Sequence, residues 1–158
     1  MATPHERLRE LGITLPSAPA PAAAYVQTRL VASGDARSLL YVAGQISREG
    51  EQLLTGRCPD EVSLEEANRR ARLTGLAVLA QIEAAVGLDN VIELTQVLGY
   101  VLSADGFGDQ PKVINGASEL FLEVFGDAGR HTRLALGTNA LPSSVTVEIG
   151  AIAVVRTV

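Results

Sequence analysis

Cysteine and histidine are scarce in this sequence of 158 residues, which has one cysteine, Cys58, and two histidines, His5 and His131. A single cysteine excludes an internal disulfide framework, and two scattered histidines offer few ligands for a zinc site. Long apolar runs are also missing, because no stretch approaches the roughly 18 uninterrupted apolar residues of a membrane span. We therefore expect no metal site and no membrane partner.

The N-terminal stretch MATPHERLRELG has charged side chains where a secretory signal peptide has an apolar block. No export is indicated by this pattern, and a cytoplasmic location is the expectation. Cys58 lies in the segment GRCPDE, which has a proline next to the cysteine and no histidine. A thiol without a neighbouring base is poorly suited to act as a nucleophile, so we assign Cys58 no catalytic role.

Positive charge is also limited, since the formal net charge is −5 at pH 7. Surfaces that bind nucleic acid usually gather Lys and Arg on one face, and the one local basic cluster here is Arg69, Arg70 and Arg72. Acidic residues precede these arginines in SLEEANRRARL, a spacing that favours ion pairs on an exposed helix face. We therefore expect a solvated helix rather than a nucleic-acid partner.

The length predicts one domain spanning residues 1–158. Residues 1–24 form its N-terminal helix and extended lead-in: Thr3, Pro4 and Glu6 resemble a helix start, and Gly12 ends the helix. The segment PSAPAPAAA, residues 16–24, has three prolines and is expected to be extended.

Strands and helices alternate along the rest of the chain. We expect strands at 25–33, 38–46 and 91–102, helices at 63–86 and 113–126, and two closing strands on either side of 141–144. This order predicts an α+β fold whose helices cover one face of a mixed sheet. The other face has no helices left to cover it, so we expect it to be buried by oligomerisation.

The closing stretch, HTRLALGTNALPSSVTVEIGAIAVV, is rich in strand-forming apolar residues but contains Arg133 and Glu148. Two interpretations stay open on the residues alone. The two charges form an ion pair across a hairpin, because buried charges are normally paired. Alternatively, they face a ligand, for which a guanidinium offers two parallel donors to a carboxylate.

Several motifs in order along residues 20–158 resemble the Rid (YjgF-type) family of imine and enamine deaminases: YVQ, AGQIS, VINGASELFLEVFG, HTRLALGTNALP and VEIGAIAV. The N-terminal ERLRELGITLPSAPAP and the longer middle loops are similar to a longer branch of the family, labelled endoribonuclease or chorismate-mutase-like. The resemblance implies a chorismate-mutase-like fold, a homotrimer with its sheets facing a central barrel, and three clefts between adjacent subunits.

The resemblance also implies the site residues. Arg133 matches the arginine that clamps the substrate carboxylate, and Glu148 matches the glutamate that positions a water. Tyr25 matches a tyrosine that lines the cleft, Asn115 matches an asparagine of the second helix, and the backbone of Ala135 would supply a further hydrogen bond. Without the resemblance, Tyr25 is equally a packed aromatic and Asn115 a helix-start residue that bonds local backbone.

Two positions depart from the usual family pattern. Ala43 stands where the deaminases have the serine of a Ser-Gly-Gln motif, and Gly150 stands where the last strand has a second glutamate. A hydroxyl and a carboxylate are therefore missing from this chain, which suggests a different or larger ligand than 2-aminoacrylate. His131 is two residues before Arg133, so a regular strand would place it on the same face, at the rim of the cleft.

The function implied by the resemblance is hydrolysis of small enamine or imine carboxylates to 2-keto acids and ammonia. This chemistry needs water and no cofactor. The first alternative is a non-catalytic trimer that binds small carboxylates, and the second is a ribonuclease, which the negative charge disfavours.

Overall fold

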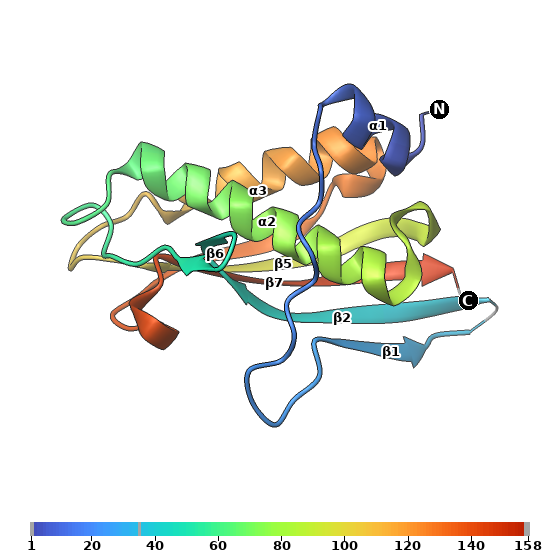
Figure 1. Ribbon diagram of the computed structural model, residues 1–158, viewed down its shortest axis with the longest axis horizontal. Coiled ribbons are helices and arrows are strands. Elements are labelled where there is room, and N and C mark those ends of the chain that lie inside the picture. Colours follow the sequence, from blue (N-terminus) through green and yellow to red (C-terminus); the bar gives the residue numbers. More distant parts are fainter. Residues whose placement is uncertain (1, 35, 157–158) are drawn as a thin grey trace.

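Residues 2–34 and 36–156 are described by a computed structural model, in which two long helices lie side by side across one face of a five-stranded sheet (Figure 1). The long elements are α2 (Leu64–Val86), α3 (Gln110–Phe125), β1 (Thr28–Ala32), β2 (Arg37–Ile46), β5 (Val91–Leu102), β6 (Thr132–Thr138) and β7 (Val147–Arg156). The short ones are α1 (Pro4–Glu10), β3 (Arg48–Glu49), β4 (Gln52–Leu53), η1 (Leu88–Asn90), η2 (Gly126–Gly129) and η3 (Pro142–Ser144). The predicted α+β class is confirmed.

The helices begin and end largely where their caps predict. The Thr3 hydroxyl accepts from the Glu6 amide and Glu6 accepts from the Thr3 amide, which completes the capping box of α1. Ser63 caps α2, and Gly87, with φ of 78°, ends it. Glu66 does not complete a second capping box, because its carboxylate binds Arg69 and Arg70 instead.

The basic cluster of Arg69, Arg70 and Arg72 forms ion pairs with glutamates of α2 and α3. Arg69 and Arg70 contact Glu66 at 2.8 and 2.9 Å, and Arg72 contacts Glu123 of α3 at 2.6 Å. The hydrogen bond from Arg69, together with that from Arg70, lowers the pKa of Glu66 to about 2. The three arginines therefore form ion pairs, as the acid–base spacing predicts. Arg70, however, is mostly buried, whereas a solvated helix face would leave it exposed.

The sheet has the strand order β1-β2-β7-β5-β6, in which β5 and β6 are parallel and the other pairs are antiparallel. The predicted hairpin between the last two strands is therefore wrong. The α3 crossover returns the chain so that β6 runs beside β5 in the same direction, and β7 then enters between β2 and β5. As a result, β6 is an edge strand.

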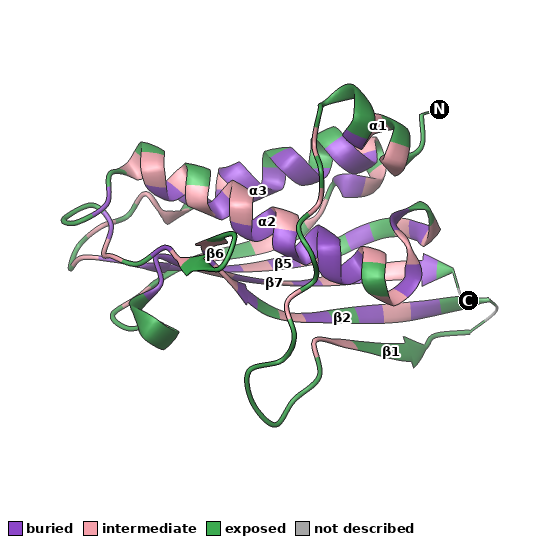
Figure 2. Cartoon of the chain, in the orientation of Figure 1, coloured by how far each residue is buried: buried purple, intermediate pink, exposed green. Residues whose placement is uncertain are grey.

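The two faces of the sheet differ in what covers them (Figure 2). Along β7, Val147, Ile149 and every second residue after them are buried in the core beneath the helices. The intervening residues face the other way, and we call this second face the open face. Its apolar side chains include Leu39, Tyr41, Leu98, Tyr100, Leu134, Leu136, Ile152 and Val154.

The N-terminal lead-in crosses α2 and then passes along the β1 side of the sheet (Figure 1). We call residues 14–27 the strap. Ile13 and Leu15 pack on the core, and the Gln81 side-chain amide of α2 donates to the Pro19 carbonyl at 2.7 Å. The predicted first strand begins at Thr28, so Tyr25 belongs to the strap and not to a strand.

Within the described part of the chain, no helix is both long and apolar enough to cross a membrane.

Candidate functional site

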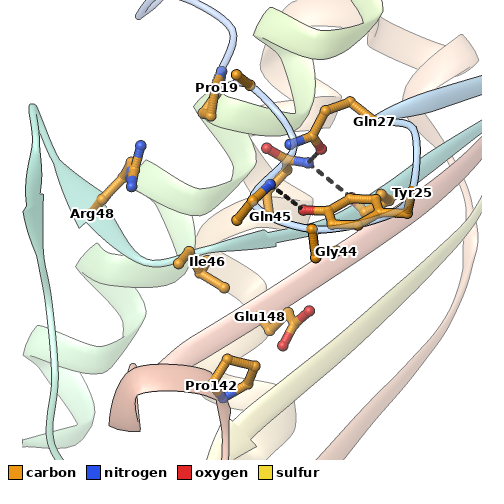
Figure 3. Close-up of a pocket in the computed structure, with 13 residues that line it drawn as sticks. Pro19, Tyr25, Gln27, Gly44, Gln45, Ile46, Arg48, Pro142 and Glu148 are labelled. Carbon is orange, nitrogen blue, oxygen red and sulfur yellow. Dashed lines mark hydrogen bonds between the residues drawn. The ribbon is translucent and has the colours of Figure 1, made fainter.

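A cavity of about 480 Å³ lies between the strap, β2, the η3 turn and β7 (Figure 3). Its wall on the strap side combines Pro19 and three alanines with Tyr25 and Gln27, and its ionisable side chains are Tyr25, Arg48 and Glu148. Pockets of a few hundred Å³ are of the size that holds small ligands. Tyr25 and Glu148, both implicated by the motif resemblance, thus line the same cavity.

Glu148 is half-buried on β7 and forms no hydrogen bond or ion pair with any residue that the structure describes. Because Val147 and Ile149 point into the core, Glu148 points toward the open face. Burial raises the pKa of its carboxyl above the ordinary value of 4.5. A carboxylate that is partly desolvated and unpaired is suited to accept a proton or to hold water.

The backbone of β2 makes room for Glu148. The β2–β7 register shifts between Val42 and Gln45, so Ala43 and Gly44 lie in an irregular stretch. A Cβ atom at Gly44 would overlap Glu148 Oε1, which explains why glycine stands there. Gly150, next to Glu148 on the open face, adds no side chain to this region.

Gln45 has no role in the sequence-based prediction, yet its buried amide joins the strap, β2 and α2. Its Nε2 atom donates to Gln27 Oε1 at 2.7 Å and to the Ala43 carbonyl at 3.0 Å. Its Oε1 atom accepts from Gln81, which also holds the strap at Pro19. The AGQ motif was the available signal, because a polar residue at a core-facing strand position needs a partner.

Tyr25 is 44% exposed, and its hydroxyl accepts a long hydrogen bond of 3.5 Å from the Ala22 amide. The ring borders the cavity rather than the core. Tyr25 is therefore a cavity residue and not an aromatic packed in the core.

Arg133 lies in a second hollow of about 290 Å³, on the helix side of the edge strand β6. Its guanidinium donates to Ser118 Oγ at 3.0 Å and to the Pro111 carbonyl at 3.2 Å, both on α3. His131 also lines this hollow, as its spacing from Arg133 predicts. The guanidinium is thus held in place by hydrogen bonds that do not neutralise its charge.

His131 completes a chain of hydrogen bonds that ends at Arg133. Its Nδ1 atom lies 2.7 Å from the Gly129 carbonyl, which can only accept, so Nδ1 carries the proton. In the neutral ring Nε2 then accepts from Ser118 Oγ at 2.9 Å, and Ser118 accepts from Arg133. Burial, and secondarily the charge of Arg133, lowers the pKa of His131, which favours the neutral form.

Asn115 is the sixth residue of α3, so the interpretation as a helix-start residue is wrong. Helical spacing places Asn115 on the same face as Pro111 and Ser118, the two residues that hold Arg133. Its side chain makes no hydrogen bond with the described residues. An amide without a partner therefore lies along the helix face that borders Arg133.

Ala135 lies on the same strand as Arg133 and packs partly on the core. The Thr138 carbonyl accepts from the Ser103 amide of the segment after β5, and backbone direction alternates along a strand. The backbone groups of Arg133 and Ala135 therefore point away from β5, toward the outer edge of β6. At that edge they are available to a ligand or to another chain.

Arg133 and Glu148 do not form an ion pair, so the first of the two interpretations of these charges is wrong. Their strands are separated by β5, where Val97 is opposite Arg133 and Tyr100 is opposite Glu148. Their side chains also lie on opposite faces of the sheet. One chain therefore has two separate half-sites: the Glu148 half-site, with Tyr25, and the Arg133 half-site, with Ser118 and His131.

Cys58 lies outside both half-sites. Its thiol is fully buried in the core, and burial raises the pKa of the thiol. A raised pKa disfavours the reactive thiolate, in agreement with a structural role.

The chain matches known proteins over almost its whole length. Residues 5–151 match the model of a family described as "YjgF/chorismate mutase-like, putative endoribonuclease". Protein TCP17 of Trypanosoma cruzi is 39% identical over 148 residues, covering 92% of this chain and 89% of that protein. The match to the family model covers the motifs that indicated the Rid family, the last of them as far as Ala151, so that prediction is confirmed.

Solved structures of other proteins resemble this chain in sequence and in fold. A protein of unknown function from Agrobacterium tumefaciens is 38% identical with a TM-score of 0.83, covering 98% of this chain and 94% of that one. TdcF of E. coli, solved with bound serine, is 26% identical with a TM-score of 0.59, covering 90% of this chain and 97% of that one. The chain therefore belongs to the YjgF/chorismate mutase-like family.

Proposed function

We propose that the protein hydrolyses small enamine or imine carboxylates to 2-keto acids and ammonia, in clefts formed between adjacent subunits of a homotrimer. The observation that carries this proposal is the separation of the two half-sites. An unpaired carboxylate, Glu148, lies on one face of the sheet, and a guanidinium without a carboxylate partner, Arg133, lies near the opposite face at a free edge. Each half has one component of the chemistry and lacks the other.

A second copy of the chain supplies the missing component. The open face is apolar along β2, β5, β6 and β7, and Leu134 and Leu136 on the edge strand are 47% and 44% exposed. Burying such a face between subunits removes apolar surface from water, which stabilises the assembly by about 25 cal/mol per Å². Packing the β6 edge of one subunit beside the Glu148 cavity of the next would bring the two half-sites together.

In this cleft the Arg133 guanidinium binds the substrate carboxylate through charge-assisted hydrogen bonds, with the Ala135 backbone and the Asn115 amide as further polar contacts. Glu148 holds a water beside the imine carbon and accepts its proton as the oxygen bonds to that carbon. Glu148 then passes this proton to the nitrogen, which gives a neutral carbinolamine. As the C–N bond breaks, the carbinolamine hydroxyl loses its proton to the nitrogen through Glu148, so that ammonia leaves and the carbonyl of a 2-keto acid forms. An enamine first takes a proton at its outer carbon to become the imine.

The raised pKa of Glu148 suits this role, because a general base is most effective when its pKa approaches the working pH. The hydrogen-bond chain from His131 through Ser118 fixes the guanidinium before substrate arrives, which reduces the ordering cost of binding. Position and orientation therefore supply much of the rate gain.

A non-catalytic trimer that binds small carboxylates is the second candidate. It is favoured by Ala43, which leaves the cavity without a serine hydroxyl, and by the related TdcF structure, which holds serine. A ribonuclease is the third, and it finds support in the family description, but the net charge of −5 and the paired state of Arg69, Arg70 and Arg72 weigh against it.

The test generates imines in place, with an amino-acid oxidase or a dehydratase, and follows 2-keto acid release with and without the protein. The wild-type protein should accelerate release. Glu148→Gln should abolish the acceleration but retain carboxylate binding in a thermal-shift assay, and Arg133→Gln should lose both. Unchanged release across several amino acids, with binding intact, would leave the binding candidate. RNA cleavage that co-elutes with the protein and falls in Arg133→Gln would support the ribonuclease.

A further inference from the structure

Arg48 differs from the other arginines of comparable burial. Six arginines are partly buried, namely Arg7, Arg48, Arg57, Arg70, Arg72 and Arg133. Five of them donate hydrogen bonds to carbonyl, hydroxyl or carboxylate oxygens. Arg48 donates none to the residues that the structure describes, and its Nε atom is buried without any partner.

A buried guanidinium nitrogen without an acceptor is costly, because its hydration is lost and nothing replaces it. The two terminal nitrogens of Arg48 also donate to no described residue, so the guanidinium as a whole is available to an acceptor that comes from outside the chain. No carboxylate among residues 2–34 and 36–156 takes that role. Glu148 lines the same cavity but is not within ion-pair distance of Arg48, and the adjacent Glu49 pairs with Arg69 at 3.1 Å.

The position of Arg48 points to a ligand. Arg48 lies on β3, where its side chain borders the Glu148 cavity and also a neighbouring cavity of about 380 Å³ beneath the strap. In Figure 3 its guanidinium lies toward Pro19, at the other side of Ile46 from Glu148. The Glu148 cavity therefore has a carboxylate at one end and an unpaired cation at the other.

We propose that Arg48 binds a second anionic group of the ligand, so that the protein selects dicarboxylates over monocarboxylates. This inference rests on the proposed function and deepens it. The first carboxylate, next to the reacting carbon, meets Arg133 of an adjacent subunit. The second, at the far end of the ligand side chain, meets Arg48. The substrate class is then the imine or enamine of an amino acid with an acidic side chain.

Charge and shape agree with this assignment. A guanidinium presents parallel donors that fit a carboxylate, and its charge does not depend on pH in the working range. Glu148 would repel an anion placed beside it, but in Figure 3 the Arg48 guanidinium lies on the other side of Ile46 from Glu148, so an anion on Arg48 is not beside that carboxylate. Glu49 and Glu51 border the neighbouring cavity, which disfavours a second anion there and leaves the Glu148 cavity as the place for it.

The experiment measures the dissociation constants of paired ligands by calorimetry: propionate against malonate, butyrate against succinate, and valerate against glutarate. Wild-type protein should bind at least one dicarboxylate about tenfold more tightly than the monocarboxylate of equal length. Arg48→Gln should remove that preference and leave the monocarboxylate constants unchanged. Arg48→Lys should retain part of it, since a point charge lacks the two-pronged fit.

The matched control is Arg9→Gln, which removes the same charge from an exposed position on α1 and should change nothing. Thermal unfolding of each variant establishes that it is folded. The inference is overturned if wild-type protein binds neither class at millimolar concentration, if it shows no preference, or if Arg48→Gln keeps the preference or weakens both classes equally. Since binding needs no turnover, a preference that depends on Arg48 without keto-acid release would overturn the proposed hydrolysis alone.

Discussion

Gly44 lies so close to the side chain of Glu148 that a methyl group at Gly44 would overlap Glu148 Oε1 and lie 3.0 Å from Cδ. The φ angle of Gly44 is outside the left-handed region, so its backbone tolerates alanine. The Glu148 carboxylate is therefore what leaves no room for a side chain at position 44. This contact connects the AGQ motif of β2 to a residue more than 100 positions away in the sequence.

Gly44→Ala should therefore displace the Glu148 carboxylate with little effect on the fold. We expect kcat/KM for imine hydrolysis to fall by about tenfold or more, because the base is moved from its water. Ala43→Gly is the control, since it changes the same irregular stretch without adding atoms. Full activity in Gly44→Ala would show that the position of Glu148 does not matter for the reaction.

Arg133→Ala should abolish carboxylate binding, because it removes charge-assisted hydrogen bonds that contribute about 1.5 to 3 kcal/mol each. The melting temperature should fall by no more than about 5 °C. Arg133 forms no ion pair with Glu148, so its loss removes no buried ion pair. Arg133→Lys should also lose binding, because the two-pronged fit is gone. Calorimetry and thermal unfolding measure the two effects.

The opposite pattern would contradict the assignment of Arg133. If the alanine variant unfolds at a much lower temperature and lysine restores stability, the charge of Arg133 is structural. Arg9→Ala is the control for loss of one positive charge far from both half-sites.

The assembly is predicted to be a trimer, so light scattering should give three times the chain mass of 16.6 kDa. Leu134→Glu places a charge on the open face at the edge strand and should shift the mass toward that of the monomer, because burying an unpaired carboxylate is costly. Leu11→Glu, at an equally exposed leucine after α1, should leave the mass unchanged. A wild-type monomer at micromolar concentration would exclude the intersubunit cleft.

His5 should make the attachment of α1 depend on pH. Its Nδ1 and Nε2 atoms lie 2.9 and 3.1 Å from Asp89 and Glu83, and the hydrogen bond to Asp89 is the main cause that raises the pKa of the imidazole. A raised pKa stabilises the folded state below the ordinary value near 6.5, and this stabilisation is lost as the pH rises through the folded-state pKa.

The difference in melting temperature between wild type and His5→Gln should therefore be larger at about pH 5.5 than at about pH 8.5. Asp89→Asn should reproduce most of the loss at the lower pH, since it removes the strongest partner of His5. A difference that stays constant across this range would mean that packing, and not charge, attaches His5. The ion pairs are exposed, so the whole effect should weaken in high salt.

Local features of the sequence predicted most elements of the fold. Thr3 and Ser63 cap their helices because a hydroxyl before an apolar period satisfies free amides, and Gly87 ends α2 in a conformation that suits glycine. The placement of β6 could not be predicted in this way. Whether two consecutive strands pair as a hairpin depends on which strand offers a free edge, and that is decided by the α3 crossover.

The candidate site could be predicted only in part, because tertiary contacts also decide which of its residues lie together. Motif matches named Tyr25, Arg133 and Glu148, and the structure brings Tyr25 and Glu148 into one cavity while Arg133 lies across the sheet. Gln45 and Arg48 were missed because their importance comes from tertiary contacts, or from the lack of them. No periodicity in the sequence distinguishes an arginine that has a partner from one that has none.

The wall that the strap contributes to the cavity includes three alanines, Ala20, Ala22 and Ala23. These residues are outside the helices and outside the sheet, so their side chains hardly affect the core. Replacing one alanine by a larger residue would shorten the cavity and leave Tyr25 and Glu148 in place. Ligand choice can therefore diverge among relatives, or be redesigned in the laboratory, through single substitutions in the strap that cost little stability.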